Sequence, residues 1–536
     1  MRPRLEIATV LLFVALAAFH TWPLAQAPGT WSRNDNGDTL LNEWALAWVA
    51  HQVVADPLHL FDGNIFYPER RTLAFSEHLV PQGLMVAPVA WAGGSPVLAH
   101  NLALLAGLAL TGWAMSRMVR LWTGNWLAGV VAGSLAAFNA HTLTRLAHLQ
   151  AQHLEFLPLA VLALDRLLEA PRVRHALWLG GWFALQALTS GYFLLFTSLS
   201  LLVAAAVRPA DWMGRRFPRA VACALLAALT AGAILLPFLA VYWRVRQDHG
   251  LVRTLAEVTG HSARLTDYLA TGARLHWGWA GRFFHGNALF PGVVGLALFV
   301  TALATSVAWT DRRARMWLGI GLVTFCLSFG THLPFYRFLF EVPPFDAVRA
   351  VVRFGQFALV AVAALAGFGA ARLLRPLGGS RRQWLAGILL VALVNAEAWR
   401  GPLAYTPYRG QPRAFETLAG EAGAVVACIP FYWLGGEVGR HGQYMLASTS
   451  NWKPMLNGYS GFQPASFLRH VEGLDRFPSE ASIEYLRANG VTHVVVDTAA
   501  FGASPLEQVD RAPGLTLWVS DGDYRIYRVL TPRGVR

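Results

Sequence analysis

The chain has 536 residues, of which 55% are hydrophobic and 14% are charged. A soluble globular protein carries about 25% charged residues, so this composition excludes a water-soluble protein and requires lipid to cover much of the surface. The formal net charge is +13, but the basic residues stand in short clusters between apolar segments. That distribution follows the positive-inside rule of membrane proteins and argues against nucleic-acid binding, which needs a continuous basic face.

Apolar segments near the length that a bilayer requires recur along the chain. They lie at 7–22, 97–119, 125–140, 153–168, 175–190, 192–207, 218–239, 290–309, 315–330, 352–373 and 383–399. The arginine clusters alternate with them, which predicts about eleven transmembrane helices, with the amino terminus inside and residues 401–536 outside. The split at 189–192 decides the sidedness, since one long helix there would place residues 401–536 in the cytoplasm. Ala25-Gln26-Ala27 matches a signal-peptidase site, so a cleaved first segment is a second interpretation.

This topology predicts an α-helical polytopic membrane domain at 1–400 and a small periplasmic α/β domain at 401–536. The expected outer loops are 25–96, 138–153, 240–289 and 331–351. In the C-terminal part, 424–429 and 493–497 are predicted strands, and 480–489 is a predicted helix with Ser479 as its N-cap. The segments 515–520 and 524–529 flank Asp521-Gly522-Asp523, which is typical of a hairpin.

The first outer loop contains two candidate catalytic acids, Asp35 and Asp38. They precede a predicted amphipathic helix at 39–53, which would lie on the membrane surface. An acid held there can take a proton from a sugar hydroxyl as a general base. The alternative is that Asp38 caps the helix, and the local residues alone favour the cap.

Two further acidic or basic side chains in this loop, Glu77 and His78, are candidates for binding a substrate or a metal. A solvated pair in a loop is the alternative interpretation, and nothing else in the sequence supports the site.

The second outer segment, 139–158, carries polar residues at helical spacing. These residues are His141, Arg145, His148, Gln152 and Glu155. If the segment is one helix, all five share a face, and a polar face inside an apolar span needs water or a partner. The pattern predicts either a cavity wall, with Glu155 as a metal or substrate ligand, or an interhelical hydrogen-bond network.

Arg349 and Arg353 are one helical turn apart at the start of the apolar segment 352–373. Two guanidinium groups there can hold a lipid phosphate or diphosphate through paired hydrogen bonds. Snorkelling toward lipid headgroups is the alternative.

Several short motifs resemble bacterial membrane proteins of the GT-C glycosyltransferase superfamily, the relatives of the dolichyl-phosphate-mannose and lipid A aminoarabinose transferases. The motifs are 35–48, Phe66-Tyr67-Pro68, Ser76-Glu77-His78 and 148–158. The C-terminal part, with Asn457-Gly458-Tyr459-Ser460-Gly461 and 485–496, is similar to the ends of YfhO-like proteins of that group.

The resemblance implies an inverting hexosyl or pentosyl transferase in the bacterial inner membrane. It would use a polyprenyl-phosphate-linked sugar, membrane lipid and a glycan, lipid or protein acceptor of the envelope, and no nucleic acid. Asp38, or else Asp35, takes the place of the first-loop acid. The cofactor stays open, with a divalent cation at Glu155 as a candidate. The second loop lacks two adjacent acids, which argues against a required metal ion. The first-loop motif is Asn-Gly-Asp rather than an acidic pair, so a lineage that has lost activity is an alternative. A lipid-linked-sugar transporter or flippase and a non-catalytic envelope assembly protein are the alternatives.

Overall fold

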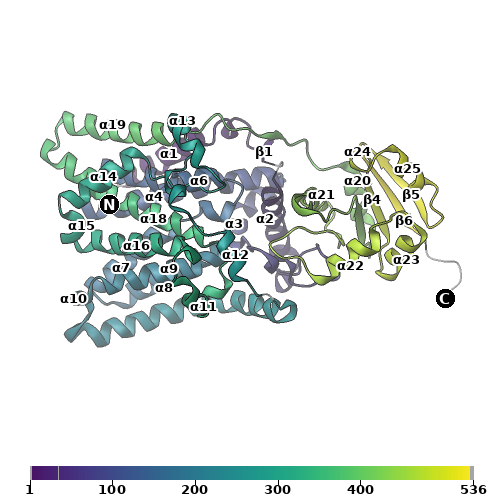
Figure 1. The fold of residues 1–536 in the computed structure, drawn as a ribbon, viewed down its shortest axis with the longest axis horizontal. Coiled ribbons are helices and arrows are strands. Elements are labelled where there is room, and N and C mark those ends of the chain that lie inside the picture. Colours follow the sequence, from purple (N-terminus) through teal and green to yellow (C-terminus); the bar gives the residue numbers. More distant parts are fainter. Residues whose placement is uncertain (1–2, 34–35, 251, 531–536) are drawn as a thin grey trace. The chain divides into compact units, whose positions relative to one another are not determined.

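The computed structural model describes residues 3–33, 36–250 and 252–530, and most of them are helical (Figure 1). The chain separates into two compact units. Unit 1 consists of Met1–Gln26, Leu102–Ala240 and Gly250–Leu403, and unit 2 consists of Ala27–Asn101, Val241–His249 and Ala404–Arg536. The segment that follows the first helix therefore packs with the C-terminal part of the chain.

Unit 1 is a helical bundle. Its helices are α1 (Pro3–His20), α4 (Pro96–Thr123), α5 (Trp126–Ala137), α6 (Ala140–Thr144), α7 (Phe156–Glu169), α8 (Val173–Thr189), α9 (Gly191–Ala206), α10 (Pro209–Trp212), α11 (Phe217–His249), α12 (Leu255–Gly260), α13 (Trp277–Ala280), α14 (Val293–Ala304), α15 (Val307–Thr310), α16 (Arg312–Ser328), α17 (Tyr336–Phe340), α18 (Phe354–Leu374) and α19 (Arg381–Ala398). The first residues of α4 and the last turns of α11 cluster with unit 2.

Each predicted apolar span forms a helix in the structure, namely α1, α4, α5, α7, α8, α9, α11, α14, α16, α18 and α19. Within the part of the chain that the structure describes, five segments are long and apolar enough to cross a bilayer: Pro3–His20, Pro96–Thr123, Trp126–Thr144, Gly214–His249 and Val351–Leu377. The chain is thus a multi-pass membrane protein, while a total of eleven crossings stays a prediction. The split between α8 and α9 is confirmed, because Ser190 has an extended backbone and ends one helix before the next begins.

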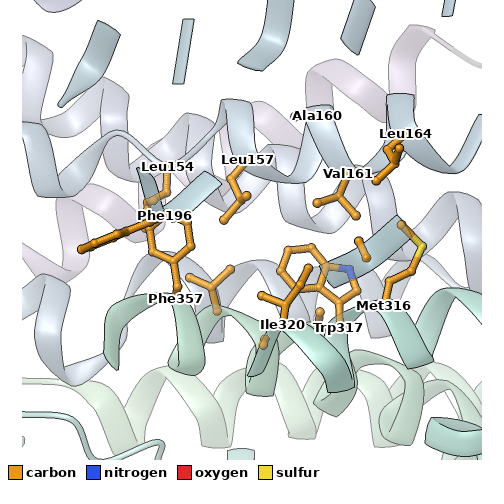
Figure 2. Close-up of a cluster of buried hydrophobic side chains, with 14 of the residues drawn as sticks. Leu154, Leu157, Ala160, Val161, Leu164, Phe196, Met316, Trp317, Ile320 and Phe357 are labelled. Carbon is orange, nitrogen blue, oxygen red and sulfur yellow. The ribbon is translucent and has the colours of Figure 1, made fainter. Parts of the chain in front are cut away.

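The core of unit 1 lies between α7, α9, α16 and α18. Figure 2 shows Leu157 and Val161 of α7 pointing toward Trp317 and Ile320 of α16, and all four side chains are 0% exposed. Inside a bilayer the hydrophobic effect does not favour helix association, because lipid tails are as apolar as leucine. Close packing of these side chains must therefore hold the helices together.

Helix α1 is held in the bundle by small residues on its neighbours. Phe13 is fully buried, and a Cβ added at Gly112 of α4 or Gly133 of α5 would lie within 2.4 Å of its ring. Small residues of this kind allow helix backbones to approach closely in membranes. Glu6 of α1 also accepts hydrogen bonds from Arg117 and Arg120 of α4. Packing and an ion-paired cluster together fix α1.

Unit 2 contains a four-stranded mixed sheet. Its helices and strands are β1 (Trp31–Ser32), α2 (Gly37–Ala55), α3 (Val80–Trp91), β2 (Thr406–Pro407), α20 (Arg413–Thr417), β3 (Val426–Ile429), α21 (His441–Ser448), α22 (Ala465–Leu474), α23 (Glu480–Ala488), β4 (His493–Asp497), α24 (Thr498–Phe501), α25 (Ala503–Asp510), β5 (Leu515–Asp521) and β6 (Tyr524–Val529). The strand order is β3-β4-β6-β5, with β3 and β4 parallel and the other pairs antiparallel. The predicted strands, the hairpin and the Ser479-capped helix are confirmed.

The prediction that residues 39–53 form a helix is confirmed by α2, but its predicted amphipathic surface position is wrong. The helix is buried on all faces from Thr39 to Ala50, and it packs against α3 and α21. Even the charged residue Glu43 is 0% exposed. Hydrophobic periodicity could not reveal the covering segments, because one of them lies about 400 residues further along the chain.

Helix α3 instead carries an exposed apolar face. Leu84, Pro88 and Trp91 stand at the spacing of one helical face and are exposed, while Val86 and Ala87 are buried. Twelve residues of helix span only about 18 Å, which is too short to cross a bilayer core of about 30 Å. Four residues later the chain enters α4, a candidate membrane span. We therefore expect α3 to lie in the membrane interface.

Spin labelling in nanodiscs tests the position of α3. In a background without Cys223, Cys326 and Cys428, a nitroxide at Leu84→Cys should be more accessible to oxygen than to a water-soluble nickel chelate. A matched label at the exposed position Glu507→Cys of α25 should show the reverse. If the labels at both positions were more accessible to the nickel chelate than to oxygen, α3 would lie in water.

Candidate functional site

The N-terminus of α2 holds the first-loop acid. Asn36 is the N-cap, and its side-chain oxygen accepts a hydrogen bond of 2.9 Å from the backbone N–H of Asp38. Asp38 therefore lies inside the first turn, and the interpretation of Asp38 as the N-cap is wrong. A carboxylate in the first turn is stabilised by the helix dipole. Asp35, the other candidate acid, lies outside the described residues.

The Asp38 carboxylate contacts the distant motif at 457–461. The Tyr459 hydroxyl donates a hydrogen bond of 2.8 Å to Asp38 Oδ1. The two segments are also joined through the loop after α2, because the backbone N–H groups of Phe66 and Tyr67 donate to the carbonyls of Asn457 and Met455. Two of the motifs that resemble the glycosyltransferases therefore meet within unit 2. Sequence reasoning missed the Asp38–Tyr459 pair, since nothing local relates the two positions.

The same helix buries a second acid that sequence reasoning did not select. Glu43 accepts a hydrogen bond of 2.6 Å from the Ser32 hydroxyl of β1. Burial raises the pKa of Glu43 to about 8, although the bond from Ser32 opposes the shift. Near neutral pH this side chain is therefore mostly an uncharged acid, which suits a structural role in the core rather than that of an ionised base.

His78 has a structural position at the start of α3. Its Nδ1 accepts a hydrogen bond of 3.0 Å from the backbone N–H of Val80, one of the donors that a helix start leaves without an internal partner. Burial lowers the pKa of His78 to about 4, so the ring is neutral and cannot supply positive charge to a phosphate. The neighbouring Ser76 carbonyl accepts a hydrogen bond from Tyr242. Glu77 is half-buried, and a substrate-binding role for Glu77 stays a prediction.

In unit 1 the polar segment 139–158 is not one helix, so the predicted single polar face is wrong. Helix α6 ends at Thr144, a 3-10 turn covers Leu149–Gln152, and α7 begins at Phe156. Gln152 Nε2 donates 2.8 Å to the Arg145 carbonyl inside this broken stretch. The alternative of a hydrogen-bond network therefore accounts for Gln152.

Glu155 belongs to the same kind of network. His153 Nδ1 lies 2.9 Å from Glu155 Oε1, and both side chains are buried. Thr111 of α4 donates to the Gln152 carbonyl and reaches Glu155 Oε2 at 3.5 Å. Among the described residues, no three His, Cys, Asp or Glu side chains gather closely enough to hold a metal ion. A metal at Glu155 stays a prediction.

A basic cluster forms around the break in segment 139–158. Arg145 donates to the Gly286 carbonyl and to Asn287 Oδ1, each at 2.9 Å. The Arg353 guanidinium lies 4.5 Å from the centre of the Tyr192 ring, where α9 begins. His141 is within electrostatic reach of Arg145, His148 and Arg353, so the structure brings these four predicted residues together. We call them the basic cluster.

Arg349 does not share a helical turn with Arg353, and that prediction is wrong. Helix α18 begins at Phe354, a 3-10 turn covers Val351–Arg353, and Arg349 precedes both. Arg349 instead lies near α12. The pKa of Glu257 in α12 is lowered mainly by the backbone N–H of Thr254, and the charge of Arg349 adds to the shift.

The sequence-predicted residues therefore form two groups, each within one unit. Asp38, Glu77 and His78 belong to unit 2, and the basic cluster, Glu155 and Arg349 belong to unit 1. The first group offers a carboxylate that can accept a proton, and the second offers guanidinium groups that can bind phosphate oxygens.

Comparisons with known proteins bear on the fold. No protein-family model and no curated protein matches the chain. Among solved structures, the chain is similar to arabinofuranosyltransferase AftD from Mycobacteria, with a TM-score of 0.66 at 14% identity, covering 100% of this chain and 40% of that one. The chain thus spans about two fifths of the AftD length.

Similarity also extends to the Archaeoglobus fulgidus oligosaccharyltransferase. The structure tethered to an acceptor peptide gives a TM-score of 0.55 at 13% identity, covering 92% of this chain and 69% of that one. The complex of AglB from this organism with an inhibitory peptide and a dolichol-phosphate gives 0.52 at 14% identity, with the same coverage. At such identities the likeness establishes the fold.

Proposed function

The chain has the fold of the GT-C membrane glycosyltransferases, and on this premise we propose that it moves a sugar from a polyprenyl-phosphate carrier to a cell-envelope acceptor. The reaction would take place on the periplasmic face of a bacterial inner membrane. The observation that carries the proposal is the carboxylate of Asp38, held in the first turn of α2 by helix capping at Asn36 and by the Tyr459 hydroxyl.

The proposed reaction is a single displacement at the anomeric carbon. Asp38 takes the proton of the acceptor hydroxyl while that oxygen forms the new glycosidic bond. The bond between the anomeric carbon and the phosphate oxygen breaks, and both of its electrons leave with the polyprenyl phosphate. Attack from the face opposite the leaving group inverts the anomeric configuration. The sugar is a hexose or a pentose, and its donor needs no nucleotide at the site.

We assign the donor phosphate to the basic cluster in unit 1. The Arg353 guanidinium stacks on the Tyr192 ring. Among the described residues it forms no ion pair with a carboxylate, so the positive charge of Arg353 is not neutralised. A guanidinium stacked on a ring keeps its edge available for phosphate oxygens. Charge from this group would stabilise the leaving phosphate.

Arg353→Gln should raise the KM for the lipid-linked donor about 10-fold with a smaller fall in kcat, since each lost charge-assisted hydrogen bond is worth roughly 1.5–3 kcal/mol. The measurement is donor saturation in proteoliposomes. Arg511→Gln, at an exposed position of unit 2, is the matched control for loss of one positive charge. An unchanged donor KM would remove Arg353 from the donor site.

A direct assay tests the proposal as a whole. Purified protein in proteoliposomes is given radiolabelled polyprenyl-phosphate pentoses and hexoses together with an envelope extract as acceptor. Release of free polyprenyl phosphate coupled to a labelled product supports transfer. Movement of the intact labelled donor across the bilayer identifies a flippase instead.

Sidedness gives a second test, because the proposal requires residues 38 and 349 on the same face of the membrane. Cysteines introduced at each position should react with an impermeant maleimide added from the periplasmic side. Labelling from opposite sides would contradict the proposed roles of these residues.

A further inference from the structure

The C-terminal motif at 457–461 lies against the N-terminus of α2. The Tyr459 hydroxyl donates to Asp38 Oδ1 at 2.8 Å, although the two residues are 421 positions apart. A hydrogen bond that ends on a carboxylate is about twice as strong as a bond between neutral groups. It also fixes the direction of the carboxylate, which a flexible aspartate alone does not do.

Of two glycines near the Tyr459 ring, only Gly37 is tightly enclosed. A Cβ added at Gly37 would lie 2.8 Å from Gly439 Cα and 3.2 Å from Tyr459 Cε1, so no larger residue fits there without displacement. A Cβ added at Gly439 would meet Gly37 Cα at 3.4 Å and Tyr459 Cε2 at 4.0 Å, which are ordinary contacts. The ring is thus closely packed on the Gly37 side alone.

The backbone around Tyr459 is fixed as well. Asn457 Oδ1 accepts from Cys428 N–H of β3 at 2.7 Å, and Asn457 Nδ2 donates to the Cys428 carbonyl at 2.8 Å. A Cβ at Gly458 would lie 2.6 Å from the Phe66 ring. Hydrogen bonds to the sheet and contact with the loop after α2 therefore hold the motif on both sides.

We infer that Tyr459 is a positioning residue for the general base, so that the C-terminal part of the chain completes the acceptor site instead of forming a separate domain. This inference rests on the proposed function of Asp38. The hydroxyl holds Oδ1 in one direction during proton transfer.

Carboxyl modification tests the contact without any substrate. A water-soluble carbodiimide with glycine ethyl ester modifies carboxyl groups, and mass spectrometry of peptides measures the rate of modification of Asp38 at one fixed pH. In Tyr459→Phe this rate should rise about 10-fold, because the carboxylate loses one charge-assisted hydrogen bond. Gly37→Ala should act in the same direction, and Gly439→Ala should have little effect.

Tyr527→Phe is the matched control, because the Tyr527 hydroxyl donates to Asp510 Oδ1 at 2.7 Å in the same unit. It should raise the modification rate of Asp510 and leave that of Asp38 unchanged. The same modification rate at Asp38 in wild type and Tyr459→Phe would overturn the inference.

Transfer activity separates this inference from the proposed function. Tyr459→Phe should lower kcat about 10-fold, with little change in donor KM. If Asp38→Asn keeps full activity, Asp38 is not the general base, even if Tyr459→Phe changes the modification of Asp38 as expected. If Asp38→Asn is inactive but Tyr459→Phe has the wild-type kcat, only the positioning role fails.

Discussion

Asp38→Asn should reduce sugar transfer by about 10²–10⁴-fold, the range that general-base catalysis contributes. The substitution keeps the size of the side chain and its place in the first turn of α2, where Asn36 supplies the cap. An amide cannot take the acceptor proton, but its oxygen can still accept the Tyr459 hydroxyl. Chemistry is therefore expected to fail while the fold is retained. The measurement is kcat in proteoliposomes, beside the yield of purified protein.

Asp510→Asn provides the matched control for Asp38→Asn. Asp510 also accepts a hydrogen bond from a tyrosine hydroxyl in unit 2, that of Tyr527. This bond is the main reason that the pKa of Asp510 is lowered. Its replacement removes one carboxylate and weakens one tyrosine contact, and it should leave kcat near the wild-type value. Equal loss of activity in the two variants would indicate a general effect on unit 2. Full activity of Asp38→Asn would exclude Asp38 as the base.

Apolar patterning predicts the elements of this chain because it depends only on neighbouring residues. Every predicted span forms a helix, and 424–429, 493–497 and the hairpin around Gly522 form the predicted strands. Sequence periodicity reports which side of an element is apolar, but not which element covers the other side. Helix α2 shows the limit, since distant segments bury the face that carries Glu43.

The prediction of one continuous helix over 139–158 is wrong for a different reason. Proline lacks an amide N–H, and its ring clashes with the carbonyl four residues earlier, so it does not fit the interior of a helix. Pro158 is therefore compatible with the first turn of α7 but not with a helix that continues from His141 through residue 158. Pro158 thus indicates a new helix start near residue 156, whereas the spacing of the polar residues at 141–155 does not.

The candidate acid itself could be predicted, but its surroundings could not. Asp38 follows from its place after the first span and from the resemblance. The Tyr459 hydroxyl and the Gly37 contact depend on how a loop near the C-terminus packs. The basic cluster likewise depends on α9 and α18, which bring Tyr192 and Arg353 to the same place.

Glu43 makes the stability of unit 2 depend on pH. In the folded chain burial raises the pKa of Glu43 from its ordinary value of 4.5 to about 8. Between these values the unfolded chain releases a proton that the folded chain keeps, so the free energy of unfolding falls as pH rises. The slope is at most about 1.4 kcal/mol per pH unit, and the loss is complete once the pH exceeds the folded pKa.

Glu43→Gln should remove this dependence. An amide keeps the shape of the uncharged acid and an oxygen that can accept the Ser32 hydroxyl, but it has no proton to lose. We expect the Tm of wild type in detergent to fall between pH 6 and pH 9, and that of Glu43→Gln to stay higher and flatter. Glu472→Gln, at an exposed position of α22, should follow the wild-type curve. Parallel curves for wild type and Glu43→Gln would mean that Glu43 is already ionised in the folded protein, and that a cation compensates its charge in the core of unit 2.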